Sequence, residues 1–296
     1  MSLTTRFPKF EFNNVPKRWA RNRAFAYDRM ATSLIPTPIE PWLIRICQDA
    51  IKQLGPGHEQ LIEDVKGFIG QESQHFRQHR LFNKAVQDLG YPDLADMEQD
   101  LTNELNEFEK NRSMKFLLAY ADGFEAMGAV SAQLWFEEFD EFLEGADPNA
   151  VALWGWHLAE EFEHREVMFN LYHALYSKGI WNKIVNGYFY RIYGLWFAMK
   201  HLGGHSGRII GYMIKQDRPN MTAEEIAELK ADREAWSGKY KKLMLPKLAR
   251  NLLPWYNPRR KKTPKGIAAY LRRFEPGGDM VRGKAKPLAE AAVAAA

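Results

Sequence analysis

The chain has 296 residues, 46% of them hydrophobic, so it is long enough to bury a sizeable core. Its single cysteine, Cys47, excludes a disulfide framework and any cysteine-rich zinc or iron–sulfur site. The net charge of +4 is small but unevenly distributed.

The first 39 residues are expected to form an N-terminal arm. They begin with MSLTTRFPKFEFNNVPKRWARN, which is basic and aromatic but lacks the uninterrupted apolar core of a secretory signal. We therefore expect a cytoplasmic protein.

Prolines and glycines divide residues 40–178 into four predicted helices. No pattern of short alternating strands is present, so the sequence predicts an all-α fold with a four-helix bundle. The expected helices cover about Glu40–Leu54, His58–Leu89, Thr102–Leu143 and Ala150–Lys178. GPG at 55–57, Gly90 and EGADPN at 144–149 separate them.

Residues 179–296 are expected to add helices and a basic tail that pack on the bundle. Residues 180–215 are helical and rich in aromatic side chains, and Thr222 with Glu225 has the spacing of a capping box. The most apolar stretch, 180–202, contains three basic residues, so we predict no transmembrane span.

Two of the four helices contain Glu-x-x-His. Glu72 and His75 lie on the second helix, and Glu161 and His164 lie on the fourth. Residues i and i+3 share a helix face, so each pair can direct a carboxylate and an imidazole to one point. A duplicated Glu-x-x-His, with one further Glu from each of the other two helices, is typical of di-iron and di-manganese bundles.

The other two helices offer a glutamate at the matching level. Glu40 and Glu72 each lie sixteen residues from Pro56, so antiparallel packing places them side by side. Glu125 lies at about the level of His164 in the second hairpin, next to small residues that leave room at the centre of a bundle.

A further histidine extends the motif of the fourth helix. His157, Glu161 and His164 form one stripe at i, i+4 and i+7, which makes His157 the favoured seventh ligand. His79 is its rival, and is otherwise expected to orient a ligand without binding metal. Asp122 and Glu160 are further candidates for that supporting role.

These motifs resemble a known family. FIGQESQHFRQHRLFN, WHLAEEFEHREVMFNLYHAL and SLIPTPIEPWLIR are similar to bacterial proteins described as predicted metal-dependent hydrolases, over about residues 30–200. The resemblance implies a ferritin-like core with two metal ions. The His-x-x-x-Glu-x-x-His stripe also resembles that of di-iron arylamine N-oxygenases, where it supplies a seventh ligand. The segment that ends at Glu40 departs from the family pattern, with an extra proline and a missing glycine.

Three functions fit this ligand set. We favour a di-iron, oxygen-dependent oxidoreductase that acts on a small apolar or aromatic molecule. The alternatives are a metal-dependent hydrolase, which manganese or zinc in place of iron would favour, and a non-enzymatic metal-binding bundle. The aromatic stretch from Trp181 to Phe197 is predicted to line the substrate pocket.

The C-terminal part of the chain is strongly basic. Eleven Lys or Arg and one acidic residue lie between Lys241 and Glu275, with Trp255, Tyr256, Tyr270 and Phe274 among them. This pattern indicates peripheral contact with an anionic membrane. A cytoplasmic protein would contact the inner face of that membrane. The alternatives are a solvated basic tail and, less favoured, contact with nucleic acid.

Overall fold

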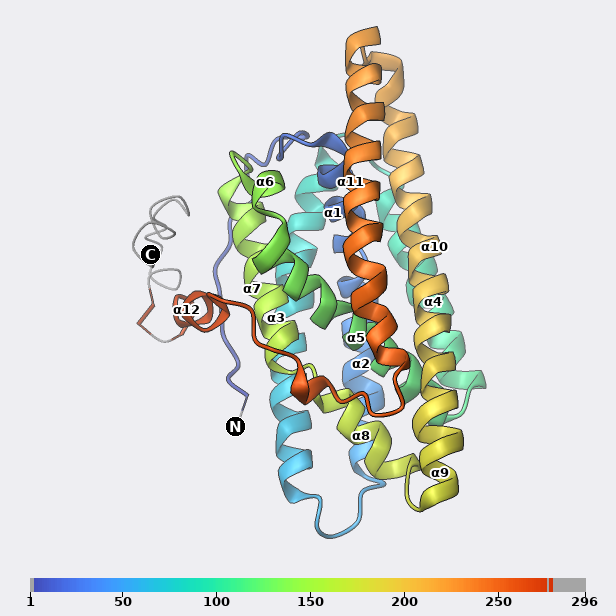
Figure 1. Cartoon of the computed structure of the whole chain (residues 1–296). Coiled ribbons are helices and arrows are strands. Elements are labelled where there is room, and N and C mark those ends of the chain that lie inside the picture. Colours follow the sequence, from blue (N-terminus) through green and yellow to red (C-terminus); the bar gives the residue numbers. More distant parts are fainter. Residues whose placement is uncertain (1–2, 276, 279–296) are drawn as a thin grey trace.

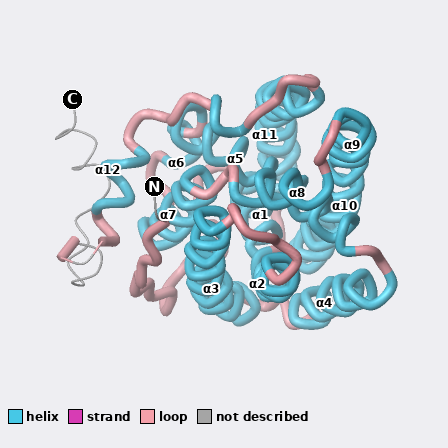
Figure 2. Tube along the Cα trace, turned by 90° about the horizontal axis from the view of Figure 1, so that it is seen from below, coloured by secondary structure: helices cyan, strands magenta, loops and turns pink. Residues whose placement is uncertain are grey.

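The computed structural model describes residues 3–275 and 277–278, and all regular elements within those ranges are helical (Figure 1). The predicted all-α class is therefore confirmed. The long helices run roughly parallel or antiparallel to one another, and α12 (Ile267–Arg272) lies to one side (Figure 2).

Four helices supply the glutamates of the predicted metal centre. They are α2 (Pro36–Ile51), α3 (Glu59–Asp88), α5 (Met114–Glu138) and α7 (Pro148–Glu163). Helix α2 begins with Pro36 in its first turn, where a missing N–H has no cost. Glu40 consequently lies on the helix and not on the proline-rich entry loop.

Two predicted helices are divided in the structure, so their expected bounds were wrong. Residues 102–143 are split because the Ser113 side chain accepts a hydrogen bond from the Phe116 N–H and starts α5, after α4 (Leu94–Asn111) has ended. Residues 150–178 are split because α7 ends at its C-cap, His164, and α8 (Val167–Tyr176) follows.

The N-terminal residues also differ from a simple arm. They include α1 (Arg23–Ser33), which Asn22 caps and which buries Phe25 against Trp135 and Trp236. Residues 3–8 run along α3, where Gln71 and Gln78 donate hydrogen bonds to the carbonyls of Thr4 and Pro8.

The C-terminal helices pack on the preceding helices, α10 (Arg191–Asp217) on α5 and α11 (Ala223–Ala249) on α1 and α5. Short α9 (Ile180–Ile184) leads through a π-helix (Val185–Tyr190) into α10, and a 3-10 turn (Arg218–Asn220) precedes α11. Two more 3-10 turns, Arg250–Leu252 and Pro258–Arg260, lead toward α12. The predicted capping box of Thr222 and Glu225 is confirmed at the start of α11.

Helices α10 and α11 form a hairpin that extends beyond the other helices (Figure 1). Helix α10 packs very closely on α5, because a Cβ on Gly194 would lie 2.3 Å from the Ala119 carbonyl oxygen. No helix in the described part of the chain is long and apolar enough to cross a membrane.

Candidate metal centre

The structure brings the seven predicted ligands together in two adjacent groups. The first group contains Glu40, His75, His157 and Glu161, and the second contains Glu72, Glu125 and His164. Within each group, one candidate ligand atom per residue lies within 4.8 Å of the others, and all seven side chains are buried.

Two carboxylates lie between the groups. Glu161 Oε1 is 3.1 Å from His157 Nε2 in the first group and 3.5 Å from His164 Nε2 in the second. Glu72 Oε1 is 3.4 Å from His164 Nε2 and 3.6 Å from His75 Nδ1. Donor atoms at about 2 Å from one ion are separated by distances of this order, so the spacing suits ligands that share cations.

Nine atoms of this set are buried without a hydrogen-bond partner. They are both carboxylate oxygens of Glu40, Glu72 and Glu125, with Glu161 Oε2, His75 Nδ1 and His164 Nε2. Buried polar atoms are normally paired, and buried charges need a partner or a metal. The inward-facing atoms therefore fit a cationic occupant.

The outward-facing imidazole nitrogens, in contrast, are all paired. His75 Nε2 lies 2.9 Å from Glu160, and Glu160 accepts a hydrogen bond from Arg6. His164 Nδ1 lies 3.0 Å from the Gln71 side-chain oxygen. These partners favour the proton on the outer nitrogen, which leaves His75 Nδ1 and His164 Nε2 free for a metal.

His79 joins His157 to a polar chain behind the centre. His79 Nε2 lies 2.6 Å from His157 Nδ1, and His79 Nδ1 lies 2.7 Å from the Ser33 hydroxyl. Ser33 in turn bonds Asn83. His157 Nε2 faces Glu161 and Glu40, so the structure places His157 in the first group and His79 behind it.

The electrostatics of the centre follow from four buried carboxylates, those of Glu40, Glu72, Glu125 and Glu161. Burial raises the pKa of Glu40 and Glu125, and the carboxylates around each raise it further. Burial and the neighbouring imidazole of His75 lower the pKa of His157, which keeps it in the neutral form that binds metals. Burial opposes the charged form of His75, but Glu160 and Glu72 raise its pKa to about 9.

Gly128 of α5 makes room for the shared carboxylate of Glu161. A Cβ at Gly128 would lie 2.1 Å from Glu161 Oε2, so no larger residue fits without moving that side chain.

Two of the three residues that were expected to support the ligands lie at the centre. Glu160 and His79 contact ligand imidazoles, whereas Asp122 points to α10 and pairs with Arg191. Sequence reasoning missed Arg6 and Gln71, which hold Glu160 and His164. No local motif indicates Arg6, because it reaches the centre from 154 residues away in the chain.

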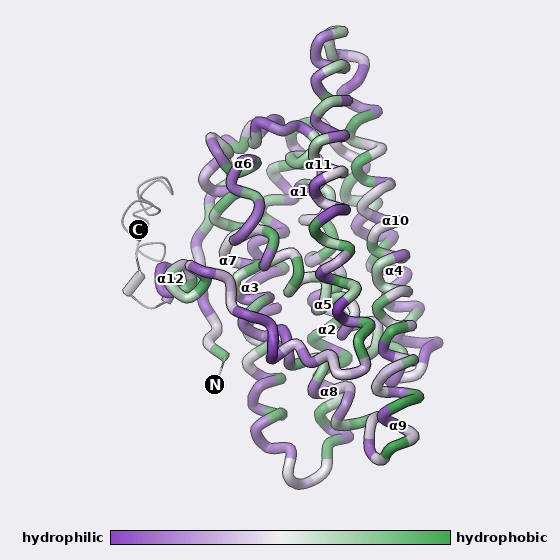
Figure 3. The backbone as a smooth tube through the Cα atoms, in the orientation of Figure 1, coloured by the Kyte–Doolittle hydropathy of each residue, from purple (hydrophilic) through white to green (hydrophobic). Residues whose placement is uncertain are grey.

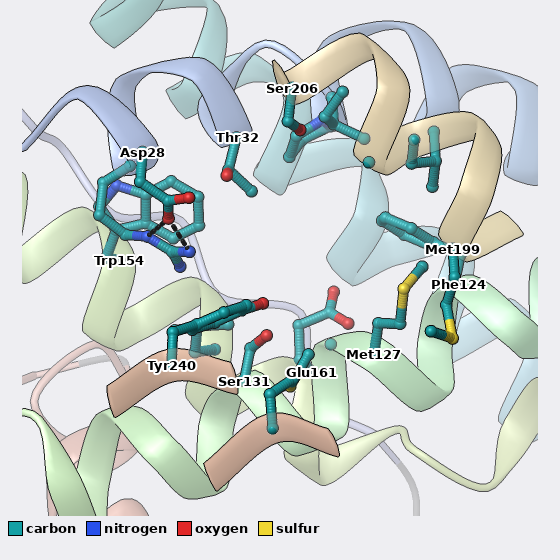
Figure 4. Close-up of a pocket in the computed structure, with 18 of the residues that line it drawn as sticks. Asp28, Thr32, Phe124, Met127, Ser131, Trp154, Glu161, Met199, Ser206 and Tyr240 are labelled. Atoms are coloured by element: carbon teal, nitrogen blue, oxygen red, sulfur yellow. Dashed lines mark hydrogen bonds and ion pairs between the residues drawn. The ribbon is translucent and has the colours of Figure 1, made fainter. Parts of the chain in front are cut away.

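A pocket of about 400 Å³ opens onto the centre. Glu161 and His157 lie on its wall, and Figure 4 shows Glu161 beside Met127 and Ser131. Most of the lining is apolar, from α5, α10 and α11, and Asp28, Arg29 and Thr32 form a polar edge. The pocket therefore suits a molecule with an apolar body.

The aromatic stretch from Trp181 to Phe197 does not line this pocket, so that prediction was wrong. The lining residues of α10 begin at Met199. Gly194 lies instead against the Ala119 backbone, and Gly187 lies against Ser177 and His173. The rings precede the part of α10 that faces the centre, and several of them are exposed.

Comparisons with known proteins give one match. A family model described as "Predicted metal-dependent hydrolase" matches residues 4–262, which is most of the chain. No curated protein and no solved structure matches. The ferritin-like assignment stays a prediction.

Proposed function

This chain belongs to the family of predicted metal-dependent hydrolases, and we propose that it is a dinuclear metal enzyme that hydrolyses a small molecule with an apolar body. One observation carries the proposal: nine polar atoms of a carboxylate and imidazole cluster are buried without a hydrogen-bond partner beside an apolar pocket.

The two groups of side chains would hold one metal ion each. Glu40, His75 and His157 would bind the first ion, and Glu125 and His164 the second, with Glu72 and Glu161 shared between them. Four carboxylates carry four negative charges, which two divalent cations neutralise. This charge balance supports two ions per chain.

When bound, such ions lower the pKa of water and polarise a carbonyl or phosphoryl oxygen. The chain supplies the surroundings. Glu160 and Gln71 fix the imidazoles of His75 and His164, which keeps the ligand nitrogens directed inward. The apolar lining around Met127 and Met199 excludes water from the substrate side.

The substrate would enter with its reactive group toward Glu161 and His157. Arg29, paired with Asp28 and stacked over Trp154, offers a cation at the polar edge of the pocket. A substrate that carries a polar group beyond its apolar body would place that group next to Arg29.

A di-iron, oxygen-dependent oxidoreductase is the second candidate. The donor set contains four carboxylates and three imidazoles but no thiolate, and it lies beside an apolar pocket. Hard and borderline donors of this kind suit iron or manganese. The apolar pocket would bind the apolar or aromatic molecule that such an enzyme oxidises.

Metal analysis and anaerobic assays distinguish these functions. We expect elemental analysis of protein purified without oxygen to give about two transition-metal ions per chain. Hydrolysis of a panel of carboxylic and phosphoric esters should proceed equally with and without oxygen. Fewer than half a metal ion per chain would refute the metal centre. Turnover only with oxygen, with consumption of oxygen, would replace the hydrolase by the oxidoreductase.

The pocket can be tested separately from the metal. A Cβ on Gly207 of α10 would meet no atom within 4 Å, and Gly207 lines the pocket, so Gly207→Trp should fill it without displacing the helices. We expect kcat/KM for long-chain esters to fall at least tenfold, with metal content retained. Gly238→Trp, on α11 outside the pocket lining, is the matched control.

A further inference from the structure

Exposed apolar side chains on α9, which lies toward the lower end of the molecule in Figure 1, and on the loop after α11 form one surface. We call it the basal surface and define it by residues 178–189 and 252–262. Its exposed apolar side chains are Ile180, Trp181, Ile184, Val185, Phe189, Leu252, Leu253 and Trp255. Trp181 is 75% exposed and Trp255 is 67% exposed, and Figure 3 shows the hydrophobic character of α9. Exposed apolar groups gathered in this way usually mark an interaction site.

The two segments of the basal surface are joined to each other. Tyr188 donates a hydrogen bond to the Leu252 carbonyl at 2.8 Å. The Arg191 guanidinium donates to the Asn251 carbonyl at 2.6 Å. The segments that carry Trp181 and Trp255 are therefore held next to each other, although about seventy residues separate these two tryptophans in the chain.

The charge of the basal surface has one sign. No acidic residue occurs between Glu166 and Asp217, nor between Glu234 and Glu275. Exposed cations flank the apolar side chains, namely Lys178, Lys183, Arg259, Arg260 and Lys262. Burial and the nearby cations Arg165, Lys247 and Arg250 lower the pKa of Lys261 to about 8, which reflects the crowding of positive charge.

We propose that the basal surface docks this protein on a bilayer that contains anionic phospholipid. Tryptophan side chains prefer the headgroup region, and basic residues around them bind lipid phosphates. Charge complementarity favours this occupant, because the two segments of the basal surface carry cations and no carboxylate, so they attract an anionic plane. Trp181 and Trp255 enter the interface, and Lys183, Arg259 and Lys262 contact the headgroups.

The structure changes which residues of the basic segment take part. Tyr270 and Phe274, two of the rings expected to contact the membrane, pack against Phe136 and Trp156. Phe274 is only 1% exposed. Trp255 remains exposed, and Trp181 of α9 joins it, from the aromatic stretch that was predicted to line the substrate pocket.

Vesicle flotation with the full chain tests the proposal. We expect flotation with vesicles of phosphatidylcholine and phosphatidylglycerol, little with phosphatidylcholine alone, and release at high salt. Arg259→Glu with Lys262→Glu should lower the partition coefficient at least tenfold, since each removed cation accounts for about fivefold. Trp181→Ser with Trp255→Ser should lower it by a similar factor at every salt concentration.

Matched variants outside the basal surface provide the controls. Phe7→Ser and Leu81→Ser replace exposed apolar side chains elsewhere, and Lys84→Glu reverses an exposed charge on α3. All three should float as the wild type does. Equal flotation with both lipid mixtures, or no effect of the tryptophan pair, would overturn the proposal. Self-association that the tryptophan pair abolishes, without flotation, would replace the bilayer by a second copy of the chain.

Discussion

Two clusters of histidine and glutamate lie among the helices, and their polar atoms are satisfied in different ways. In the buried centre, nine atoms of the ligand set have no hydrogen-bond partner. The second cluster joins Glu104 of α4 to His201 and His205 of α10. Glu104 Oε2 lies 2.6 Å from His201 Nε2 and 3.0 Å from His205 Nε2, and the outer nitrogens contact Tyr120 and Arg208.

The comparison shows that residue type and proximity do not by themselves indicate a metal. In the second cluster, which we call the surface cluster because Glu104 is exposed, each imidazole nitrogen has a hydrogen-bond partner. The Arg208 cation lies beside His205, so the network needs no metal ion. In the centre the carboxylates would repel one another without a cation. We expect metal at the centre and none at Glu104.

The largest expected effect follows from removal of a shared carboxylate. Glu72→Leu should at least halve the metal content, and the loaded protein should lose about 4 kcal/mol, the contribution of a ligand present at a thousandfold its Kd. The metal-free variant should be more stable than metal-free wild type by about 1–4 kcal/mol, because one buried charge is gone. Elemental analysis and unfolding with and without chelator measure both. Glu104→Gln is the control and should keep its metal.

Gly128 allows the centre to be disturbed with every ligand still present. Gly128→Ala places a methyl group 2.1 Å from Glu161 Oε2, which forces that side chain to move, so we expect metal affinity to fall at least tenfold. Gly207→Ala on α10 has free space around its Cβ and should leave affinity unchanged, with a helix stabilised by up to about 1 kcal/mol. Equal affinity of both variants would mean that Glu161 is not needed at this position.

The roles of His157 and His79 can be separated by metal titration. A residue that only orients a ligand typically changes affinity 10–100-fold, so His79→Ala should fall in about that range. His157→Ala should lose more than 100-fold, because it removes a ligand nitrogen. If His157→Ala retained both ions and an unchanged optical spectrum, the seven-ligand arrangement would be wrong.

The smallest effect is expected at the surface cluster and depends on pH. Burial lowers the pKa of His201 below its usual value of 6.5. The unfolded chain therefore takes up a proton first as pH falls, and the stability that neutral His201 contributes is lost below about pH 6.5. His201→Asn should reduce the fall in urea midpoint between pH 7.5 and pH 5.5, with metal content unchanged. A steeper fall in the variant would contradict this sign.

The sequence was most informative where one helix carries a motif. Glu72 with His75, and Glu161 with His164, share a face whatever the tertiary packing, because the 3.6-residue period fixes it. Counting residues from the turn of each hairpin also indicated Glu40 and Glu125, which lie in the same cluster in the structure. Asp122, which was expected only to support a ligand, pairs instead with Arg191 of α10, whose position no local pattern indicates.

The sequence by itself determined the all-α class and a set of candidate ligands, since helical periodicity and spacing are local properties, and its motifs carried the resemblance to the family. Only the tertiary structure decided which other residues surround the centre and which segments form the pocket and the basal surface. The contact of Arg6 with Glu160, the pocket between α5, α10 and α11, and the hydrogen bond of Tyr188 to the Leu252 carbonyl join segments that lie far apart in the chain. Such contacts depend on how whole helices pack, which residue spacing within one helix does not specify.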